Sequence, residues 1–77
     1  MAVYSDLLKE LRKDKHLTQK MIGEFFNMSG PTYSMYENGR RRMSVQMLSD
    51  LADILGTSTD YLLGRTDNPE PYPKRKK

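Results

Sequence analysis

The distribution of apolar and polar positions along the chain predicts short amphipathic helices. Apolar residues recur three and four positions apart between residues 5 and 13 and again between residues 19 and 26, a spacing that places their side chains on one helix face. Thr18 stands where the second helix needs an N-cap, because its hydroxyl can accept a free backbone N–H. Asn27 follows this helix and tolerates the left-handed conformation of a sharp turn. We therefore expect two helices and then a tight corner.

A third helix is predicted over residues 30–37. Ser29 can cap its first turn, and Pro31 falls within that turn, where the missing N–H of proline costs nothing. Asn38 and Gly39 follow as residues that end helices. The third helix is thus marked at both ends.

Two further helices complete the predicted core. Ser44 opens the fourth, which carries one apolar stripe and stops at Gly56. Ser58 caps a short fifth helix over residues 59–63. The apolar residues expected to close the core from these two helices are Leu48, Leu51, Ala52, Leu55, Leu62 and Leu63.

Packing is expected to end at Gly64. Residues 65–77 contain three prolines and almost no aliphatic side chain, so we expect an extended or disordered segment. The predicted organisation is one domain over residues 1–66 and a proline-rich basic tail over residues 67–77. Its four basic residues, 74–77, are interpreted as a disordered end rather than a DNA-binding arm.

Length and composition restrict the chain to one small domain. Its 77 residues, 36% of them apolar, are close to the minimum that a single hydrophobic core can stabilise. Without cysteine it can form neither a disulfide nor a thiolate zinc site, and His16 has no second histidine to complete a metal site. No leader-like or membrane-spanning apolar run is present, so the expected location is the cytoplasm.

Charge is unevenly distributed along the chain. The formal net charge is +3, but removing the four basic residues at 74–77 leaves nine basic against ten acidic residues. Residues 15–42 hold five basic and two acidic side chains, whereas residues 43–73 hold one arginine and five acids. This polarity favours a surface that faces phosphates, although many ordinary domains show similar asymmetry.

Two short helices joined by a tight turn, over residues 18–37, form a helix-turn-helix pattern. Gly23 is small enough to let the third helix cross the second closely. The side chains expected to anchor the third helix against its neighbours are Met28, Tyr33 and Tyr36.

Three short sequences resemble the phage-repressor-like (Cro/XRE-type) helix-turn-helix family: Leu17-Thr18-Gln19, Glu37-Asn38-Gly39-Arg40 and Leu62-Leu63-Gly64. The resemblance covers about residues 4 to 67. It implies a compact five-helix, lambda-repressor-like domain whose third helix enters the major groove of double-stranded DNA. The chain differs from the family in having glycine for the usual alanine at position 23 and asparagine for the usual glycine at position 27. Relatives also often carry base-reading side chains at positions 30 and 31.

The resemblance implies a set of site residues on this chain. The residues expected to contact bases are Gly30, Pro31, Thr32, Ser34 and Met35. The residues expected to contact phosphates are Thr18, Gln19, Asn38, Arg40, Arg41 and Arg42. The family glutamine at position 19 would also brace the start of the third helix. A structural pair is expected between Arg12 and Glu37. The alternative interpretation is that they are two unrelated surface charges.

Two classes of function remain open. The first is a transcriptional regulator, expected to repress as a homodimer bound to two half-sites of a DNA operator. The alternative is an antitoxin or an adaptor that uses the same helical surface to bind protein. The chain lacks paired carboxylates in a pocket-forming context, a Ser-His-Asp set and a phosphate-binding glycine loop, so we expect no enzyme, cofactor or small-molecule effector.

Overall fold

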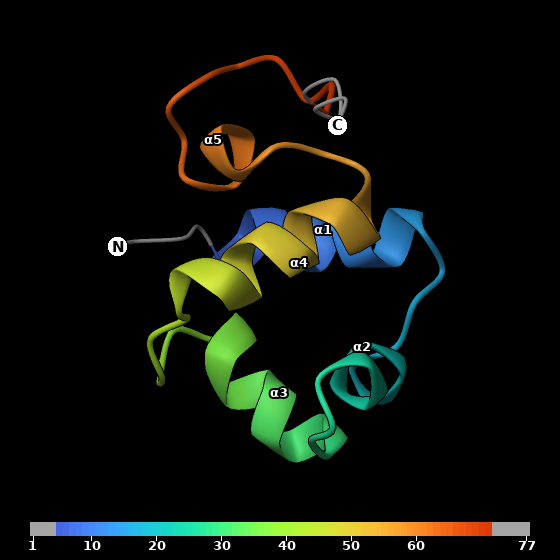
Figure 1. Cartoon of the computed structure of the whole chain (residues 1–77). Helices are drawn as coiled ribbons and strands as arrows, with labels where there is room; N and C mark the ends of the chain where they lie inside the picture. The colour runs from blue at the N-terminus through green and yellow to red at the C-terminus, as the bar shows by residue number, and fades with distance from the viewer. Residues whose placement is uncertain (1–4, 72–77) are drawn as a thin grey trace, which may run out of the picture.

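In the computed structural model, residues 5–71 are described, and they form an all-helical domain without strands in that part of the chain (Figure 1). Figure 1 shows α1 and α4 across the middle of the domain, with α2 and α3 on one side and α5 on the other. The all-α, five-helix prediction is confirmed. The helices are α1 (Ser5–Asp14), α2 (Gln19–Phe25), α3 (Gly30–Glu37), α4 (Val45–Leu55) and α5 (Thr59–Leu62).

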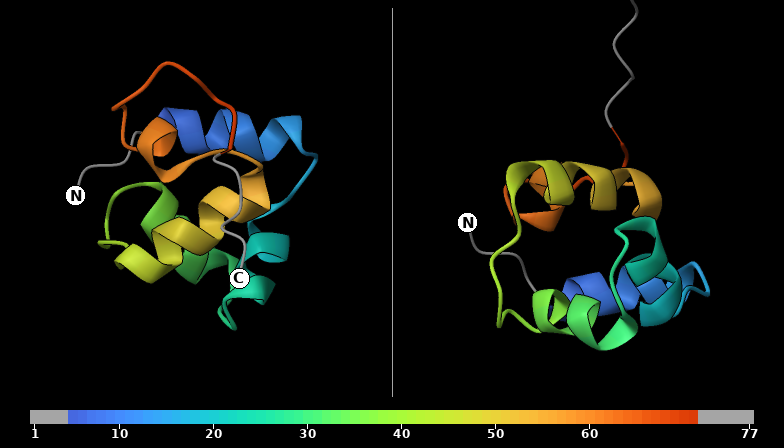
Figure 2. Two further views of the ribbon diagram at one scale, coloured as in Figure 1. Left: turned by 45° about the horizontal axis from the view of Figure 1, so that its top comes forward. Right: turned by 60° about the horizontal axis from the view of Figure 1, so that its bottom comes forward.

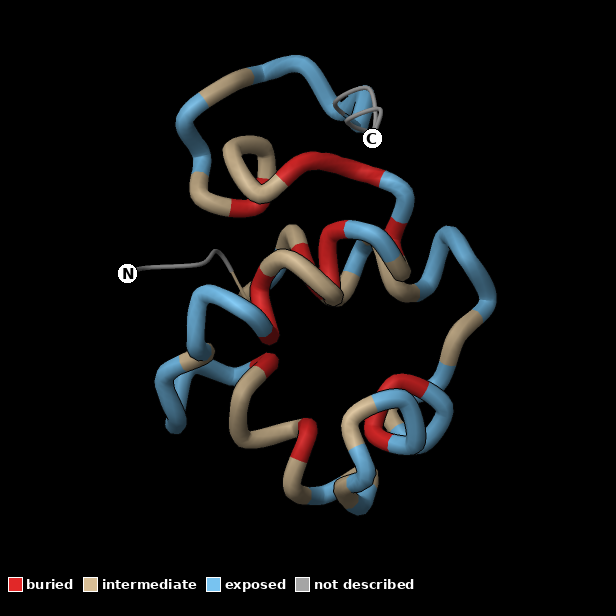
Figure 3. Tube along the Cα trace, viewed as in Figure 1, coloured by how far each residue is buried: buried red, intermediate tan, exposed pale blue. Residues whose placement is uncertain are grey.

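One apolar core joins the helices, with α4 as its largest contributor. Figure 3 shows buried residues at intervals along α4 and in the segment that leads to α5. The predicted stripe of α4 is buried, and Leu62 of α5 closes the core as expected. The buried apolar residues are Leu8, Ile22, Tyr33, Met47, Leu48, Leu51, Ala52, Leu55 and Leu62. The core therefore fixes α3 through Tyr33, an aromatic residue with no exposed surface.

Hydroxyl side chains cap four of the helices at the predicted positions. Each accepts a hydrogen bond from the backbone N–H three residues later, which satisfies one of the free donors of the first turn. The four caps are Thr18, Ser29, Ser44 and Ser58. In α2 the cap is reciprocal, because the sulfur of Met21 accepts the backbone N–H of Thr18 at 3.5 Å.

All five helices end in the same way. A residue with positive φ follows each helix, and the next backbone N–H returns to a carbonyl of the last turn, as in the Schellman motif. Asn27, at φ 56°, makes the predicted corner after α2. His16, interpreted from the sequence only as a loop residue, has φ 58° and ends α1. The five positions are His16, Asn27, Gly39, Gly56 and Gly64.

Gly23 lies where the turn between α2 and α3 folds back onto α2. A Cβ atom at this position would lie 2.7 Å from the carbonyl oxygen of Met28 and 3.0 Å from that of Ser29. Both neighbours are backbone atoms, which cannot rotate away. The small residue therefore permits a close approach, as predicted, but it accommodates the turn rather than α3 itself.

We expect Gly23→Ala to destabilise the domain by about 1 kcal/mol, because overpacking typically costs about 1–3 kcal/mol and outweighs a helix-propensity gain of about 1 kcal/mol. Thermal unfolding measures the change. Gly30→Ala is the matched control, since its Cβ would meet Lys20 at an ordinary contact distance of 3.4 Å. Equal stability of Gly23→Ala and the unmodified chain would show that the turn relaxes freely.

The segment after α5 remains in contact with the domain as far as it is described. The hydroxyl of Thr57 donates a hydrogen bond of 2.7 Å to the carbonyl oxygen of Pro69. Packing therefore continues beyond Gly64, where the sequence predicted it to end. The predicted disordered basic end, residues 74–77, lies outside the described residues.

Candidate nucleic-acid interface

Helices α2 and α3 form the predicted helix-turn-helix, and they lie side by side at the end of the domain away from α5 (Figure 2). The turn between them contains Asn27 in the left-handed conformation. The first turn of α3 meets the first turn of α2, because the open side of Gly30 faces the backbone of Lys20. Both helix N-termini are thereby brought to the same end of the unit.

One face of α3 is buried and the opposite face is accessible. Tyr33 and Glu37 have no exposed surface, so they fix the inward direction of the helix. Pro31, on the opposite side at 100° per residue, is exposed. None of the five predicted base-contacting residues is buried: Pro31 is exposed, and the partly exposed ones are Gly30, Thr32, Ser34 and Met35.

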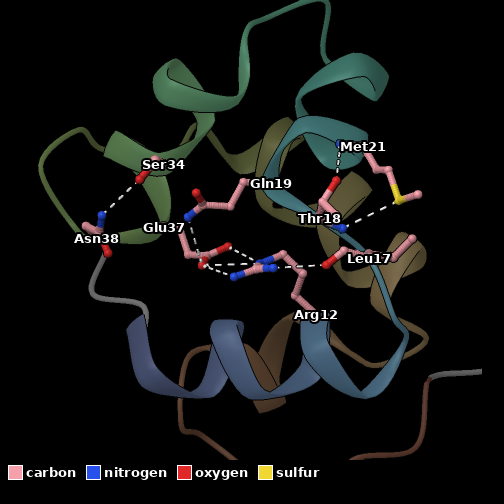
Figure 4. Close-up of polar contacts among 8 residues, drawn as sticks. All are labelled: Arg12, Leu17, Thr18, Gln19, Met21, Ser34, Glu37 and Asn38. Carbon is pink, nitrogen blue, oxygen red and sulfur yellow. Dashed lines mark hydrogen bonds and ion pairs between the residues drawn. The ribbon is translucent and has the colours of Figure 1, made fainter.

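Hydrogen bonds hold the two hydroxyl side chains of this face. The amide nitrogen of Asn38 donates to the hydroxyl oxygen of Ser34 at 3.0 Å (Figure 4). The hydroxyl of Ser29 donates to Oγ1 of Thr32 at 2.9 Å and accepts the backbone N–H of Thr32 at 3.2 Å. Both hydroxyls therefore have defined neighbours.

The predicted phosphate-binding arginines form an exposed loop directly after α3. The backbone N–H groups of Arg40 and Arg41 both donate to the carbonyl oxygen of Met35, at 2.8 and 3.2 Å. The guanidinium of Arg41 lies over the ring of Tyr36, with 5.5 Å between its central carbon and the ring centroid, which permits a cation–π interaction. The loop is thus tied to the last turns of α3, and Arg42 is exposed beside it.

Arg12 and Glu37 form an ion pair between α1 and the end of α3 (Figure 4). Nε of Arg12 donates to Oε2 of Glu37 at 3.0 Å, and Nη2 donates to Oε1 at 3.2 Å. The Glu37 side chain has no exposed surface, whereas that of Arg12 is 12% exposed. A further nitrogen of Arg12 donates to the carbonyl oxygen of Leu17 at 2.9 Å, so one guanidinium connects three segments.

A helix-turn-helix family profile matches residues 8–62. This range is most of the chain and includes every residue of the interface described above. The chain belongs to the Cro/XRE-type helix-turn-helix family.

Several curated proteins named as HTH-type transcriptional regulators are similar to this chain. The HTH-type transcriptional regulator AnsR of Bacillus subtilis (strain 168) is 38% identical over 69 residues, which are 90% of this chain and 60% of that protein. The uncharacterized HTH-type transcriptional regulator YobD of the same strain is 34% identical over 74 residues, 96% of this chain and 66% of YobD. The chain therefore spans less than two thirds of the length of these relatives. No solved structure matches it at a comparable level of significance.

Two of the site residues implied by the Cro/XRE-type pattern have different surroundings in the structure. Gln19 was expected to brace the start of α3, but its Nε2 donates to Oε1 of Glu37, at the end of α3, at 3.3 Å. Gly30 was expected to contact bases. The position of its absent Cβ instead faces Lys20 of α2, at an ordinary contact distance of 3.4 Å. A role for the Gly30 backbone in base contact stays a prediction.

Tyr33, predicted only to anchor the third helix against its neighbours, also lies close to the Arg12–Glu37 ion pair. Among residues 5–71 its buried hydroxyl makes no hydrogen bond of normal geometry, although it lies close enough to the carboxylate of Glu37 to interact with it. Burial is the main cause that raises the pKa of Tyr33, and the nearby carboxylate of Glu37 raises it further. The phenol is therefore neutral and tightly packed at physiological pH.

The structure also bears on sites of other kinds. Within residues 5–71, no group of three or more histidine, aspartate or glutamate side chains is arranged to hold a metal ion. In the same part of the chain, no helix combines the length and the apolar character that crossing a membrane requires.

Proposed function

We propose that the chain supplies the DNA-binding domain of a transcriptional repressor that acts in the cytoplasm, with α3 in the major groove of double-stranded DNA. The observation that carries the proposal is the accessible face of α3, held rigidly from behind by buried Tyr33 and Glu37. Relatives named as HTH-type transcriptional regulators support the same class of function. Residues 1–66 would form the binding domain, and residues 67–77 would form a tail.

The proposed contacts divide into two sets. Pro31 and Met35 would pack against thymine methyl groups, with Thr32 and Ser34 donating or accepting hydrogen bonds beside them. Phosphates would be bound on both sides of the groove, at the N-terminus of α2 and along the loop after α3. The residues proposed for phosphate contact are Thr18, Gln19, Asn38, Arg40, Arg41 and Arg42. Of these, Gln19 would bind phosphate with the amide hydrogen that Glu37 does not use.

Selection of bound sequences from random duplex DNA tests the function directly. A preferred site should emerge, and its affinity should fall steeply as salt concentration rises. The alternative function, an antitoxin or adaptor that binds protein, predicts weak duplex binding and no recovered consensus. An absence of salt-dependent duplex binding would therefore reject the proposal and favour that alternative.

We expect the domain to occupy its operator as a homodimer, with half-sites about 34–36 Å apart. The proposed dimer surface comes from α4 and α5 or their flanks. Val45, at the start of α4, is 72% exposed, and Tyr61 of α5 is half-buried, so apolar surface is accessible there. Sedimentation of the free chain and of its complex with selected DNA measures the assembly. A monomer under both conditions would contradict the prediction.

Met35→Ala should weaken binding to the selected site by roughly 1 kcal/mol, the value of burying one or two methylene groups. Binding to random DNA should change less, because the lost contact is with a base rather than with the backbone. Titration of both DNAs under the same salt conditions measures the difference. Equal weakening on both would assign Met35 to general packing, and a guanine-rich site without thymine beneath α3 would overturn this account of readout.

A further inference from the structure

The hydroxyl of Ser34 is not free to donate and accept equally. Its oxygen accepts a hydrogen bond from the amide nitrogen of Asn38 at 3.0 Å (Figure 4). An amide nitrogen can only donate, so this contact always occupies a lone pair of the serine oxygen. Ser34 therefore presents to an outside group its own O–H, which is a hydrogen-bond donor, and only one remaining lone pair.

The N-cap of α3 likewise leaves the hydroxyl of Thr32 as a hydrogen-bond donor. Ser29 must accept the backbone N–H of Thr32 to cap the helix, at 3.2 Å. The hydrogen of the Ser29 hydroxyl is then directed to Oγ1 of Thr32, at 2.9 Å. The O–H of Thr32 remains for an outside acceptor, and a chain of hydrogen bonds in one direction strengthens each member.

We infer that Asn38 and Ser29 act as positioning residues that fix Ser34 and Thr32 as hydrogen-bond donors, so that α3 selects thymine in the major groove. The inference rests on the proposed function and makes its readout specific. In the groove, thymine presents an acceptor, O4, next to an apolar C5-methyl group, whereas cytosine presents a donor. The donor hydroxyls match O4, and the side chains of Pro31 and Met35 match the methyl group.

The other bases fit this face less well. Guanine presents acceptors but no methyl group, and adenine combines an acceptor with a donor amino group. A hydroxyl next to that amino group can accept its hydrogen only with the one remaining lone pair, and its own O–H then has no acceptor at that position, which is costly once water is excluded. Thymine is therefore the base whose pattern the two hydroxyls and two apolar side chains satisfy together.

Base analogues test the contact with O4 and the contact with the C5-methyl group separately. After selection gives the preferred duplex, each thymine beneath α3 is replaced in turn by deoxyuridine, which lacks only the methyl group, or by the 5-methylpyrimidin-2-one nucleoside, which lacks O4 together with the N3–H that pairs with adenine. Only the part of its effect that disappears in the Ser34→Ala variant is therefore assigned to a contact between the protein and O4. The unmodified chain should bind the O4-deleted duplex about tenfold more weakly at one or more positions, the effect of one lost hydrogen bond to a desolvated group. We call this ratio of dissociation constants the O4 ratio.

Variants of Asn38 test its positioning role, because they can reverse the direction of the hydrogen bond that it makes with Ser34. Asn38→Asp places a carboxylate, which can only accept, beside Ser34, so the serine hydroxyl should turn to it and offer lone pairs to the DNA. The O4 ratio should then fall from about ten to near one at the affected thymine, and a new selection should favour cytosine or adenine there. Ser34→Ala should also bring the ratio to near one. A phosphate contact by Asn38 would weaken all duplexes alike and would leave the ratio unchanged.

Gln46→Ala is the matched control. Like Asn38, Gln46 is exposed and its side-chain amide donates to a residue four positions away, but its partner is Asp50 and both residues belong to α4. Its O4 ratio should equal that of the unmodified chain. If no duplex is bound, the proposed function itself fails. If a duplex is selected but the O4-deleted analogue binds equally well at every position, DNA binding stands and the thymine inference is overturned. An O4 ratio that persists in Asn38→Asp would likewise remove Asn38 from the positioning role.

Discussion

Glu37→Ala should lower the free energy of unfolding by about 3–5 kcal/mol, a large part of the roughly 5–15 kcal/mol that keeps a small domain folded. The carboxylate has no exposed surface and receives hydrogen bonds from Arg12 and Gln19. Its removal leaves a guanidinium that is only 12% exposed with a single backbone acceptor, at Leu17. The cost comes mainly from this uncompensated charge rather than from the attraction that is lost.

Chemical denaturation of three further variants isolates this cause. Glu24→Ala, the same change at an exposed glutamate of α2, should alter stability by only a few tenths of a kcal/mol. The double variant Arg12→Met with Glu37→Leu should recover much of the loss, because neither charge is then buried alone. A change of only a few tenths for Glu37→Ala would mean that water reaches the pair and that it behaves like surface charges. Glu37→Gln should lie between these limits, since it keeps an acceptor but loses the charge.

The helix boundaries could be predicted from the sequence because their signals are local. Ser29 and Pro31 mark the start of α3, and the predicted range of residues 30–37 agrees with the observed helix. The end of α2 is one residue earlier than predicted, at Phe25. A cap depends on hydrogen bonds within three or four residues, so residue type at a single position carries most of the information.

Features that depend on competition between segments were harder to predict. Phe25 fits an i, i+3 apolar spacing with Ile22, yet it is 66% exposed and lines a shallow apolar groove on α2. Helix α2 has only seven residues, and its buried side is taken by Ile22 and Gly23. His16 adopts a left-handed conformation that asparagine or glycine would signal, but histidine gives no such signal.

The site was predictable only as far as the family pattern extends. The pairing of Arg12 with Glu37 crosses 25 positions of sequence, and periodicity carries no information about such a contact. The resemblance pointed to it, but not to the third partner, Gln19, or to the position of the Tyr33 hydroxyl beside the pair. The orientation of Gly30 toward α2 could be seen only in the folded structure, because a glycine in a sequence does not indicate which segment it will face.

Replacing Arg40, Arg41 and Arg42 together by glutamine should weaken binding to any duplex by on the order of 10²- to 10³-fold at 0.1 M salt. Each phosphate contact that is lost lowers the slope of log affinity against log salt by about 0.9, so three contacts lower it by about 2.7. The preferred sequence should not change, because phosphates carry no sequence information. Titration at several salt concentrations, on selected and on random duplexes, gives both the slope and the preference.

Geometry makes this loop a better candidate for phosphate contact than its charge alone. Its backbone is bonded to the carbonyl oxygen of Met35, and Arg41 is held over Tyr36, so little flexibility has to be lost on binding. The matched control replaces Lys13, Lys15 and Arg65, three exposed residues outside the helix-turn-helix, by glutamine, and it too reduces the formal net charge from +3 to 0. If both triple variants lose the same affinity and slope, overall charge explains the binding and the loop has no special role. If only the arginine variant loses them, the loop after α3 faces the phosphates.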